Sequence, residues 1–374
     1  MNRRQLLGTA LPLLAAPRLL RAQSAGGPIQ ITDVAGRKVT LPRQPKRIAL
    51  TQARHVLAMG LLHPDPVSLI TGWGYDLRQM NPPDYATVRA RFPKADSIPI
   101  IVRDQADGLS LETLIAGQPD VLVLGRGSAR AQNEEMADRV SALGIPTVVI
   151  DFYIDPMRNT RRSMAILGQI LGREDRAAAF DAFYMEKRNT IAGRLEGLGN
   201  ARPKVMMHAH AGGTPCCFSP GRGAFDAMIT FAGGHNIGAD VLPGATGQLS
   251  LEYLVTQDPK IYVATGGPFG ERGGIPLGRG VQKETAERAL ADVIKRTRLD
   301  ILPCVKAGRA HAIWHGFNDT PAHIIMLEAM ARWFHPDRCG DLDPAATMAA
   351  LNSQFLAIPM EGAHWAGLPS GTAF

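Results

Sequence analysis

The chain has few cysteines and lacks the motifs that mark several enzyme classes. It holds four cysteines in 374 residues, and no two of them are spaced as CxxC, so a thioredoxin-type redox centre is not expected. No nucleophile elbow, zinc-binding His-Glu helix or paired-carboxylate arrangement is found. After the N-terminal segment, no stretch is apolar and long enough to cross a membrane. With 45% hydrophobic and 20% charged residues, the composition is that of a globular protein. Because these catalytic motifs are missing, we expect that it is not an enzyme.

A strong excess of positive charge is also missing from most of the chain. The formal net charge is +7, but four arginines and no acidic residue lie within residues 1–24. Removing these four charges leaves a formal net charge of +3. A mildly basic chain gives no reason to expect a nucleic-acid partner.

Residues 1–24 have the pattern of a cleaved export signal. Arg3 and Arg4 precede the apolar run 6–16, and small residues follow at 22–24. The arginine pair resembles a twin-arginine signal, and an ordinary secretory signal is the alternative. The first cysteine is Cys216, so a lipid anchor on an N-terminal cysteine is not expected. We expect a soluble, monomeric protein of the periplasm.

One pattern occurs twice along the chain. Residues 109–125 read LSLETLIAGQPDVLVLG, residues 249–265 read LSLEYLVTQDPKIYVAT, and the two align without a gap. In each, a serine suited to cap a helix precedes a short helical pattern, a proline ends it, and a β-rich apolar run follows. The repeat predicts two related α/β lobes.

Strand patterns alternate with helical patterns in both halves, which predicts mostly parallel sheets. We predict strands at 47–50, 67–71, 121–124, 147–150, 204–208, 261–264 and 310–314. Between the halves, Asp155 and Pro156 begin a long helical pattern that Gly172 can divide into two helices. The predicted fold is two Rossmann-like α/β lobes, residues 29–152 and 201–366. A long connector helix within 153–200 joins them, and a ligand cleft lies between them.

These features resemble the periplasmic substrate-binding proteins of ABC importers, in the class with a rigid helical connector that carries iron–siderophore complexes, cobalamin or haem. The resemblance rests on residues 31–50, the two LSLE segments, the connector, and residues 307–337, which begin AGRAHAIWHGFNDTP. It implies an ABC permease as partner, with Glu112 and Glu252 docking on permease arginines. The alternative for these glutamates is that they complement the dipoles of their helices.

In open α/β lobes, ligands meet the loops beyond the carboxyl ends of parallel strands. Arginines beside glycine in these loops suit an anionic group, and aromatic rings offer flat apolar walls. Glycines on both sides predict that Trp73 lies in a loop, whereas Trp314 and Phe317 are also core candidates. The predicted ligand-binding residues are Arg54, Trp73, Tyr75, Arg126, Tyr153, His210, Cys216, Cys217, Arg222, Trp314, His315 and Phe317.

The segment HAHAGGTPCCFSPGRG at 208–223 raises the question of a metal site. The soft ligands within reach would be His208, His210, Cys216, Cys217 and His235. Adjacent cysteines point apart in an extended chain, and no motif of a closed site is present. We favour a cleft loop in which Arg222 binds an anionic group and the thiols line the wall, with no cofactor other than the bound chelate. Four cysteines permit three pairings, and a bond between the adjacent pair is the less usual one.

The favoured function is a receptor that delivers an anionic metal chelate, first a ferric siderophore, to an ABC importer. A cobalamin or haem receptor is the alternative within the class. Haem would require an axial tyrosine or histidine, for which Tyr75, Tyr153, His210 and His315 are candidates. An exported metal-dependent enzyme that uses the His/Cys cluster is the alternative from another class.

Overall fold

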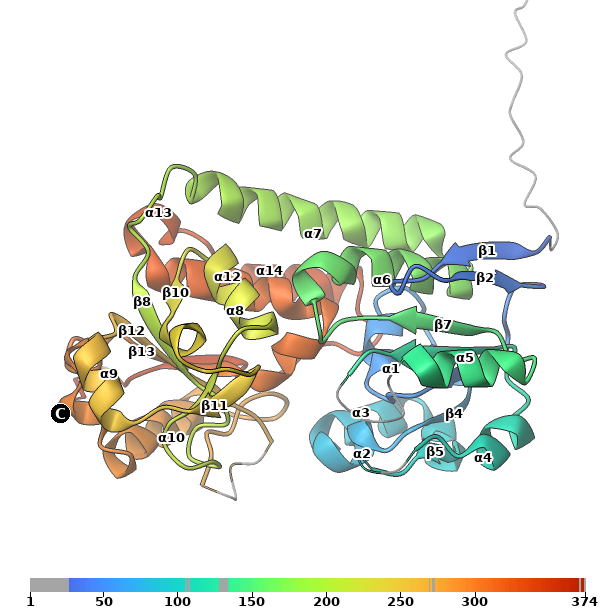
Figure 1. The fold of residues 1–374 in the computed structure, drawn as a ribbon, viewed down its shortest axis with the longest axis horizontal. Coiled ribbons are helices and arrows are strands. Elements are labelled where there is room, and N and C mark those ends of the chain that lie inside the picture. Colours follow the sequence, from blue (N-terminus) through green and yellow to red (C-terminus); the bar gives the residue numbers. More distant parts are fainter. Residues whose placement is uncertain are drawn as a thin grey trace, which may run out of the picture.

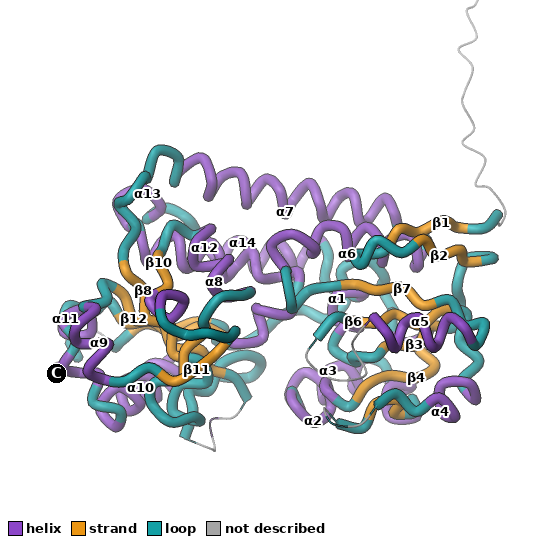
Figure 2. The backbone as a smooth tube through the Cα atoms, viewed as in Figure 1, coloured by secondary structure: helices purple, strands orange, loops and turns teal. Residues whose placement is uncertain are grey.

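The computed structural model describes residues 27–104, 106, 108–127, 134–268, 270, 273–369 and 371–372, so the predicted export signal lies outside the described residues. Two α/β lobes lie side by side, and helices join them along one edge (Figure 1). Strands form the interior of each lobe and helices flank them (Figure 2). Within the described residues, no helix is both long and apolar enough to span a membrane. The predicted fold class, two α/β lobes with parallel sheets, is confirmed.

The N-terminal lobe is built on a parallel sheet of order β5-β4-β3-β6-β7. Its strands β6 and β7 are buried at every residue, as expected when helices cover both faces of a sheet. The strands are β3 (Ile48–Leu50), β4 (Ile70–Gly74), β5 (Ile100–Val102), β6 (Val121–Gly125) and β7 (Thr147–Ile150). An antiparallel hairpin of β1 (Ile29–Thr32) and β2 (Lys38–Leu41) precedes them. The helices are α1 (His55–Met59), α2 (Asp76–Met80), α3 (Pro82–Arg91), α4 (Leu111–Ala116) and α5 (Glu134–Ala142).

The C-terminal lobe has a second sheet of order β10-β8-β12-β13-β14, in which only the β13–β14 pair is antiparallel. Its strands are β8 (Lys204–His208), β10 (His235–Asn236), β12 (Ile261–Gly266), β13 (Ala310–Trp314) and β14 (Trp365–Gly367), and β9 (Phe218–Pro220) pairs separately with β11 (Thr246–Gln248). The helices are α8 (Ala224–Phe231), α9 (Leu251–Gln257), α10 (Lys283–Arg296), α11 (Pro303–Lys306), α12 (Ile324–Phe334), α13 (Pro336–Cys339) and α14 (Pro344–Gln354).

The repeated segments form the same structure in both lobes. Ser110 and Ser250 cap α4 and α9, and each serine hydroxyl accepts a hydrogen bond from the backbone N–H three residues later. Each helix leads into a strand next to the first parallel strand of its sheet, β6 beside β3 and β12 beside β8. The prediction of two related lobes is therefore confirmed at the level of strand order.

The connector is a pair of helices, where the sequence predicted one long helix with a possible break. Helices α6 (Pro156–Leu171) and α7 (Glu174–Arg194) pack against each other, and Arg161 of α6 pairs with Asp181 of α7. The chain reverses at Gly172, whose φ of 60° is the left-handed conformation that favours glycine. Helix α7 then runs above both lobes (Figure 1).

Two predictions around β4 are wrong. Residues 67–69 form a single helical turn, and the strand begins at Ile70. Trp73 lies within this strand and is 2% exposed, so it belongs to the core. The flanking glycine serves a close approach, because a Cβ on Gly74 would lie 2.3 Å from the carbonyl oxygen of Thr51. The glycines are thus needed because neighbouring segments approach the strand closely, and they do not indicate a loop as the sequence suggested.

Candidate ligand cleft

A cleft between the two lobes is the main candidate site. Its empty space, with the open mouth included, is about 1380 Å³. The described residues that line it are Arg54, Leu57, Ala58, Tyr75, Asp76, Leu77, Met80, Asn81, Tyr153, His210, Gly267, Pro268, Trp314, His315, Gly316, Asn318, Asp319 and Thr320. Most of them follow the carboxyl ends of β3, β4, β8, β12 and β13, which is where ligands bind in open parallel sheets.

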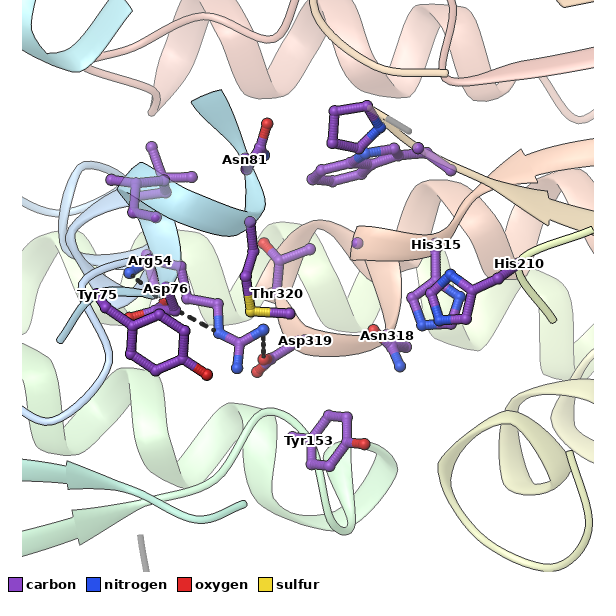
Figure 3. A pocket seen from close by; sticks show the side chains of 18 residues that line it. Arg54, Tyr75, Asp76, Asn81, Tyr153, His210, His315, Asn318, Asp319 and Thr320 are labelled. Atoms are coloured by element: carbon purple, nitrogen blue, oxygen red, sulfur yellow. Dashed lines mark hydrogen bonds and ion pairs between the residues drawn. The ribbon is translucent and has the colours of Figure 1, made fainter. Parts of the chain in front are cut away.

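Arg54 reaches across the cleft between carboxylates from the two lobes (Figure 3). Its Nη1 lies 2.7 Å from Asp319 Oδ2, and its Nε lies 3.4 Å from Asp76 Oδ2. Asp76 also accepts the backbone N–H groups of Ala53, at 2.6 Å, and of Arg54, at 3.1 Å. These bonds hold the carboxylate of Asp76 against the start of α1. The guanidinium is therefore already paired before any ligand arrives.

Burial and ion pairing shift the pKa values of Arg54 and Asp319 in opposite directions. Burial lowers the pKa of Arg54, but the charges of Asp319 and Asp76 raise it further, and the net shift is upward. Burial raises the pKa of Asp319 to about 6, although the charge of Arg54 lowers it. Near neutral pH the cluster therefore carries one positive charge and two carboxylates, with Asp319 close to its titration range.

Two histidines on the C-terminal lobe form a stacked pair at the cleft wall (Figure 3). The rings of His210 and His315 are 3.7 Å apart between centroids and are tilted by 29°. Thr265 at the end of β12 fixes both residues, because its hydroxyl accepts the backbone N–H of His210 and shares a 2.9 Å hydrogen bond with His315 Nδ1. Burial lowers the pKa of His210. Burial, with the charges of His210 and Arg54, lowers the pKa of His315 well below its usual value. Both rings are therefore neutral near pH 7 and can offer a lone pair.

Six of the twelve predicted ligand-binding residues line the cleft, and six do not. Those in the cleft are Arg54, Tyr75, Tyr153, His210, Trp314 and His315. Phe317 is fully buried, as is Trp73. Arg126 pairs with Glu134 at 2.9 Å outside the cleft. Arg222 is exposed, and its Nε makes a long 3.5 Å hydrogen bond to the carbonyl of Ala239.

The cysteine pair does not line the cleft either. Cys216 and Cys217 are joined to each other by a disulfide, the pairing that the sequence made the less usual one, while Cys304 and Cys339 are free and buried. Because both sulfurs are bonded, the adjacent side chains do not point apart as an extended chain would place them. The two sulfurs and a ring nitrogen of His208 lie within 4.8 Å of one another.

Sequence reasoning missed the acidic side of the cleft. Asp76 and Asp319 follow β4 and β13 in the stretches GYDLR and HGFND, where the search for anion-binding arginines gave no weight to carboxylates. Reading every charged residue after a strand end, of either sign, would have found both. Glu112 and Glu252, predicted to dock on a permease, lie exposed in the first turns of α4 and α9.

Comparisons with known proteins agree with this architecture. The sequence pattern of the family described as periplasmic binding protein matches residues 62–312. A cobalamin-binding protein of Halobacterium salinarum is 27% identical over 239 residues, which are 63% of this chain and 58% of that protein. The chain thus spans less than two thirds of that relative's length. The iron(3+)-hydroxamate-binding protein YxeB of Bacillus subtilis is 29% identical over 97 residues, 26% of this chain and 27% of that protein.

Solved structures show the same fold at lower sequence identity. The TroA-like periplasmic binding protein FepB of Veillonella parvula has a TM-score of 0.84 at 23% identity and covers 91% of this chain and 100% of its own. A periplasmic heme binding protein of Pseudomonas aeruginosa has a TM-score of 0.55 at 16% identity, with 88% and 100% covered. The fold is therefore that of the TroA-like binding proteins. Since the family pattern covers well over half of its length, the chain belongs to the periplasmic binding protein family.

Proposed function

We propose that the protein is the periplasmic receptor of an ABC importer for a large metal chelate of little net charge, with a corrinoid as the first candidate. The observation that carries this proposal is the charge of the cleft. Arg54 is the only lysine or arginine among the described residues that line it, and two carboxylates hold it. A chelate with several negative charges would meet no free cation among these described residues and would lie against Asp76 and Asp319.

This proposal departs from the expectation of an anionic chelate. That expectation relied on arginines next to glycine, and neither Arg126 nor Arg222 lines the cleft. Ferric catecholates and citrate complexes carry several negative charges and are disfavoured. The charge of the cleft does not disfavour a neutral corrinoid, nor a ferric hydroxamate that is uncharged or cationic.

The walls of the cleft also suit a corrinoid. Tyr75, Tyr153 and Trp314 supply aromatic surface from both sides. The neutral imidazoles of His210 and His315 can face the metal of a chelate or donate hydrogen bonds to its periphery. The relative from Halobacterium salinarum is a cobalamin-binding protein, which supports the same choice.

A ferric hydroxamate is the second candidate. The relative YxeB is an iron(3+)-hydroxamate-binding protein, although the match covers only 26% of this chain. Hydroxamate complexes satisfy the charge argument as well as corrinoids do. The ferric siderophore expected from the sequence thus stays in the proposal in this restricted form.

Delivery would occur by docking of the two lobes on a membrane permease. Glu112 and Glu252 lie at equivalent positions of the two lobes and are exposed, so they can meet two arginine clusters at once. The paired helices α6 and α7 make a stiff connection, which favours small movements of the lobes during capture and release.

The test is a tryptophan-fluorescence titration of the purified protein with chelates that differ in charge. The probes are cyanocobalamin, a cationic linear ferric trihydroxamate, a ferric triscatecholate, ferric citrate and haemin. We expect saturable quenching by cyanocobalamin with a Kd below about 1 µM, weaker binding of the trihydroxamate, and little binding of the anionic complexes. Tightest binding of the triscatecholate would overturn the charge argument, and binding of none would overturn the receptor proposal.

Two tryptophan variants show whether the signal comes from the cleft. Trp314 lines the cleft, whereas Trp333 stacks on His311 and does not line it. Trp314→Phe should remove most of the quenching, and Trp333→Phe should preserve it. Quenching that depends on Trp333 would place the bound chelate elsewhere.

A further inference from the structure

A second cluster of donor atoms lies beside the cleft at the end of β8. His208 is the last residue of β8, and Cys216 and Cys217 end the loop that leads into β9. The two sulfurs and one imidazole nitrogen come within 4.8 Å of one another. None of the three residues lines the cleft, so this cluster is separate from the chelate site and its role does not depend on which chelate binds.

His208 has a nitrogen without a partner. The residue is 0% exposed, and its Nδ1 shares a 3.1 Å hydrogen bond with the hydroxyl of Tyr262. Its buried Nε2 has no hydrogen-bond partner among the residues that the structure describes. Buried polar atoms are normally satisfied, so such an atom calls for a physical explanation. Burial also lowers the pKa of His208 to about 4, which keeps the ring neutral and its lone pair available.

The loop that carries the sulfurs is held on several sides. Ala209 donates its backbone N–H to the carbonyl of Phe218 at 2.8 Å, and Ala211 donates to Thr265 at 3.1 Å. Cys217 and Leu249 exchange two backbone hydrogen bonds, at 3.0 and 3.3 Å. These contacts keep the cysteines next to His208 whether or not the two sulfurs are bonded. Cys217 is buried and Cys216 is partly exposed, so a reductant or an ion can reach the pair from the side of Cys216.

We propose that reduction of the Cys216–Cys217 disulfide opens a binding site for one thiophilic metal ion, held by both sulfurs and by His208 Nε2. The reductant is a dithiol, which is itself oxidised to a disulfide. Its two electrons and two protons pass to the protein, where the S–S bond breaks and two thiols form. The incoming ion then displaces the two thiol protons, and the single lone pair of the neutral imidazole, on Nε2, completes the site.

The donor set selects the class of ion. Two thiolates and one imidazole are soft to borderline ligands, and three donors suit monovalent copper better than a hard divalent cation such as Mg²⁺. For Nε2 to bind the ion, Nδ1 carries the proton of the neutral ring and donates to the hydroxyl oxygen of Tyr262. This hydrogen bond fixes the orientation of the ring, as second-shell partners do in metal sites. In the oxidised protein the sulfurs are bonded to each other and the thiolates that bind the ion do not exist. The site is thereby gated by redox state.

The test is an anaerobic titration of the purified protein with Cu⁺ in competition with bicinchoninate. The protein is used either as isolated or after reduction with a phosphine and removal of the reductant. A mass increase of two hydrogens in the reduced sample verifies that the disulfide has opened. We expect one equivalent of Cu⁺ on the reduced protein and none on the oxidised protein. Equal uptake by both forms, or no uptake by the verified reduced form, would overturn the proposal.

Variants separate this site from the other cysteines. Cys304→Ser/Cys339→Ser removes both free cysteines and should still take up one equivalent. Cys216→Ser/Cys217→Ser should take up none, and His208→Asn should bind at least about tenfold more weakly. Undiminished binding by His208→Asn contradicts the assignment. If that variant does not fold, X-ray absorption at the copper edge of the reduced native protein decides the question, because two sulfur neighbours and one nitrogen neighbour are required.

Discussion

Asp76 and Asp319 hold the Arg54 guanidinium from the two sides of the cleft, with closest contacts of 3.4 Å and 2.7 Å. Both carboxylates are 4% exposed, whereas the side chain of Arg54 is one third exposed. The exposed part of the arginine faces the space where a ligand would lie. Its charge is largely cancelled by the two acids behind it, so the preference of the cleft depends on those acids as much as on the arginine.

Removing one of the acids should therefore change which chelates bind. Asp319→Asn keeps the shape of the side chain and leaves Arg54 with one carboxylate, so the cleft gains one unit of positive charge. We expect the affinity for haemin or ferric citrate to rise about tenfold, which is about 1.4 kcal/mol, while cyanocobalamin binding changes little. Fluorescence titration measures both. Asp337→Asn, an exposed position on α13, is the control. An unchanged ratio of affinities in Asp319→Asn would contradict the charge argument.

For single residues, the sequence predicts which side chains lie in the cleft better than it predicts which residues they contact. Tyr75, Tyr153, His210 and His315 were expected in the cleft because they follow strand ends, which is a local property of the chain. The pairing of Arg54 with Asp319 joins residues that are far apart in the sequence, and no local pattern contains it. The disulfide and the burial of Trp73 were also missed, because both depend on close contacts with other segments.

The loop between β12 and α10 makes a second bridge between the lobes. Arg279 of this loop donates from Nε to Asp84 of α3 at 2.7 Å, and both side chains are only 11% exposed. Arg279 also donates to the carbonyl of Pro359. Asn81, which lines the cleft, donates its amide to the other oxygen of Asp84. The bridge thus lies at the rim of the cleft, where it opposes separation of the lobes.

Breaking this bridge should open the unliganded protein. Asp84→Asn removes the charge and leaves Arg279 buried with a weaker partner, which costs more than loss of a surface pair. We expect a larger radius of gyration in small-angle X-ray scattering and a lower Tm. Arg279→Ala should give a similar change. The double variant should change the radius of gyration and Tm by less than the sum of the two single changes, because the two residues share one interaction.

A pair inside the connector provides the matched control. Asp181→Asn breaks a contact with Arg161 between α6 and α7, where the side chains are 35% and 47% exposed. Because both residues lie within the connector, the radius of gyration should stay that of the native protein. If Asp181→Asn opened the protein as much as Asp84→Asn, the bridge at the rim would have no special part in closure.

The bounds of helices and strands were more predictable than the packing of these elements against one another. Strands β7, β8 and β13 match the predicted ranges at both ends, and the duplicated helix–strand unit gave the relation between the lobes. Continuous apolar runs and serine caps are local signals, so they can be recognised from the sequence without knowledge of the contacts made in the folded protein. The start of β4 was predicted too early, at Val67. Residues 67–69 form a helical turn although they belong to the same apolar run as the strand. The connector was predicted, but its reversal at Gly172 depends on packing of α6 against α7.

At the scale of the whole molecule, buried histidines should make the protein sensitive to acid. Burial lowers the pKa of His55 and His323 to about 3 and that of His208, His311 and His364 to about 4. In the unfolded chain these groups titrate near pH 6.5. Between pH 6.5 and 4 the unfolded chain therefore binds more protons, and each such proton costs about 1.4 kcal/mol of stability per pH unit. We expect Tm to fall by more than about 5 °C between pH 7.5 and 5.

Asp319 acts in the opposite direction and supplies the control for this prediction. Its folded pKa of about 6 lies above the usual value, so its contribution stabilises the acid form and is lost as pH rises towards 6. Asp319→Asn removes this contribution, and its Tm should fall more steeply with acid than that of the native protein. A native Tm that is equal or higher at pH 5 would show that the buried histidines do not control stability.

The proposed docking on a permease would involve both lobes, since α4 and α9, which carry Glu112 and Glu252, lie on separate lobes (Figure 1). Docking that uses both should need both charges, because each lobe would contact its own arginine cluster. We expect Glu112→Lys/Glu252→Lys to keep native chelate affinity in fluorescence titration and to abolish uptake by cells that carry the importer. Each single reversal should reduce uptake by about tenfold or more, the loss expected for one close charge pair.

Glu135→Lys/Glu284→Lys is the matched control, because it reverses exposed glutamates in the first turns of α5 and α10, again one on each lobe. If the control pair abolished uptake as well, overall charge would be responsible, and if the Glu112/Glu252 pair left uptake intact, the two glutamates would serve only the dipoles of their helices.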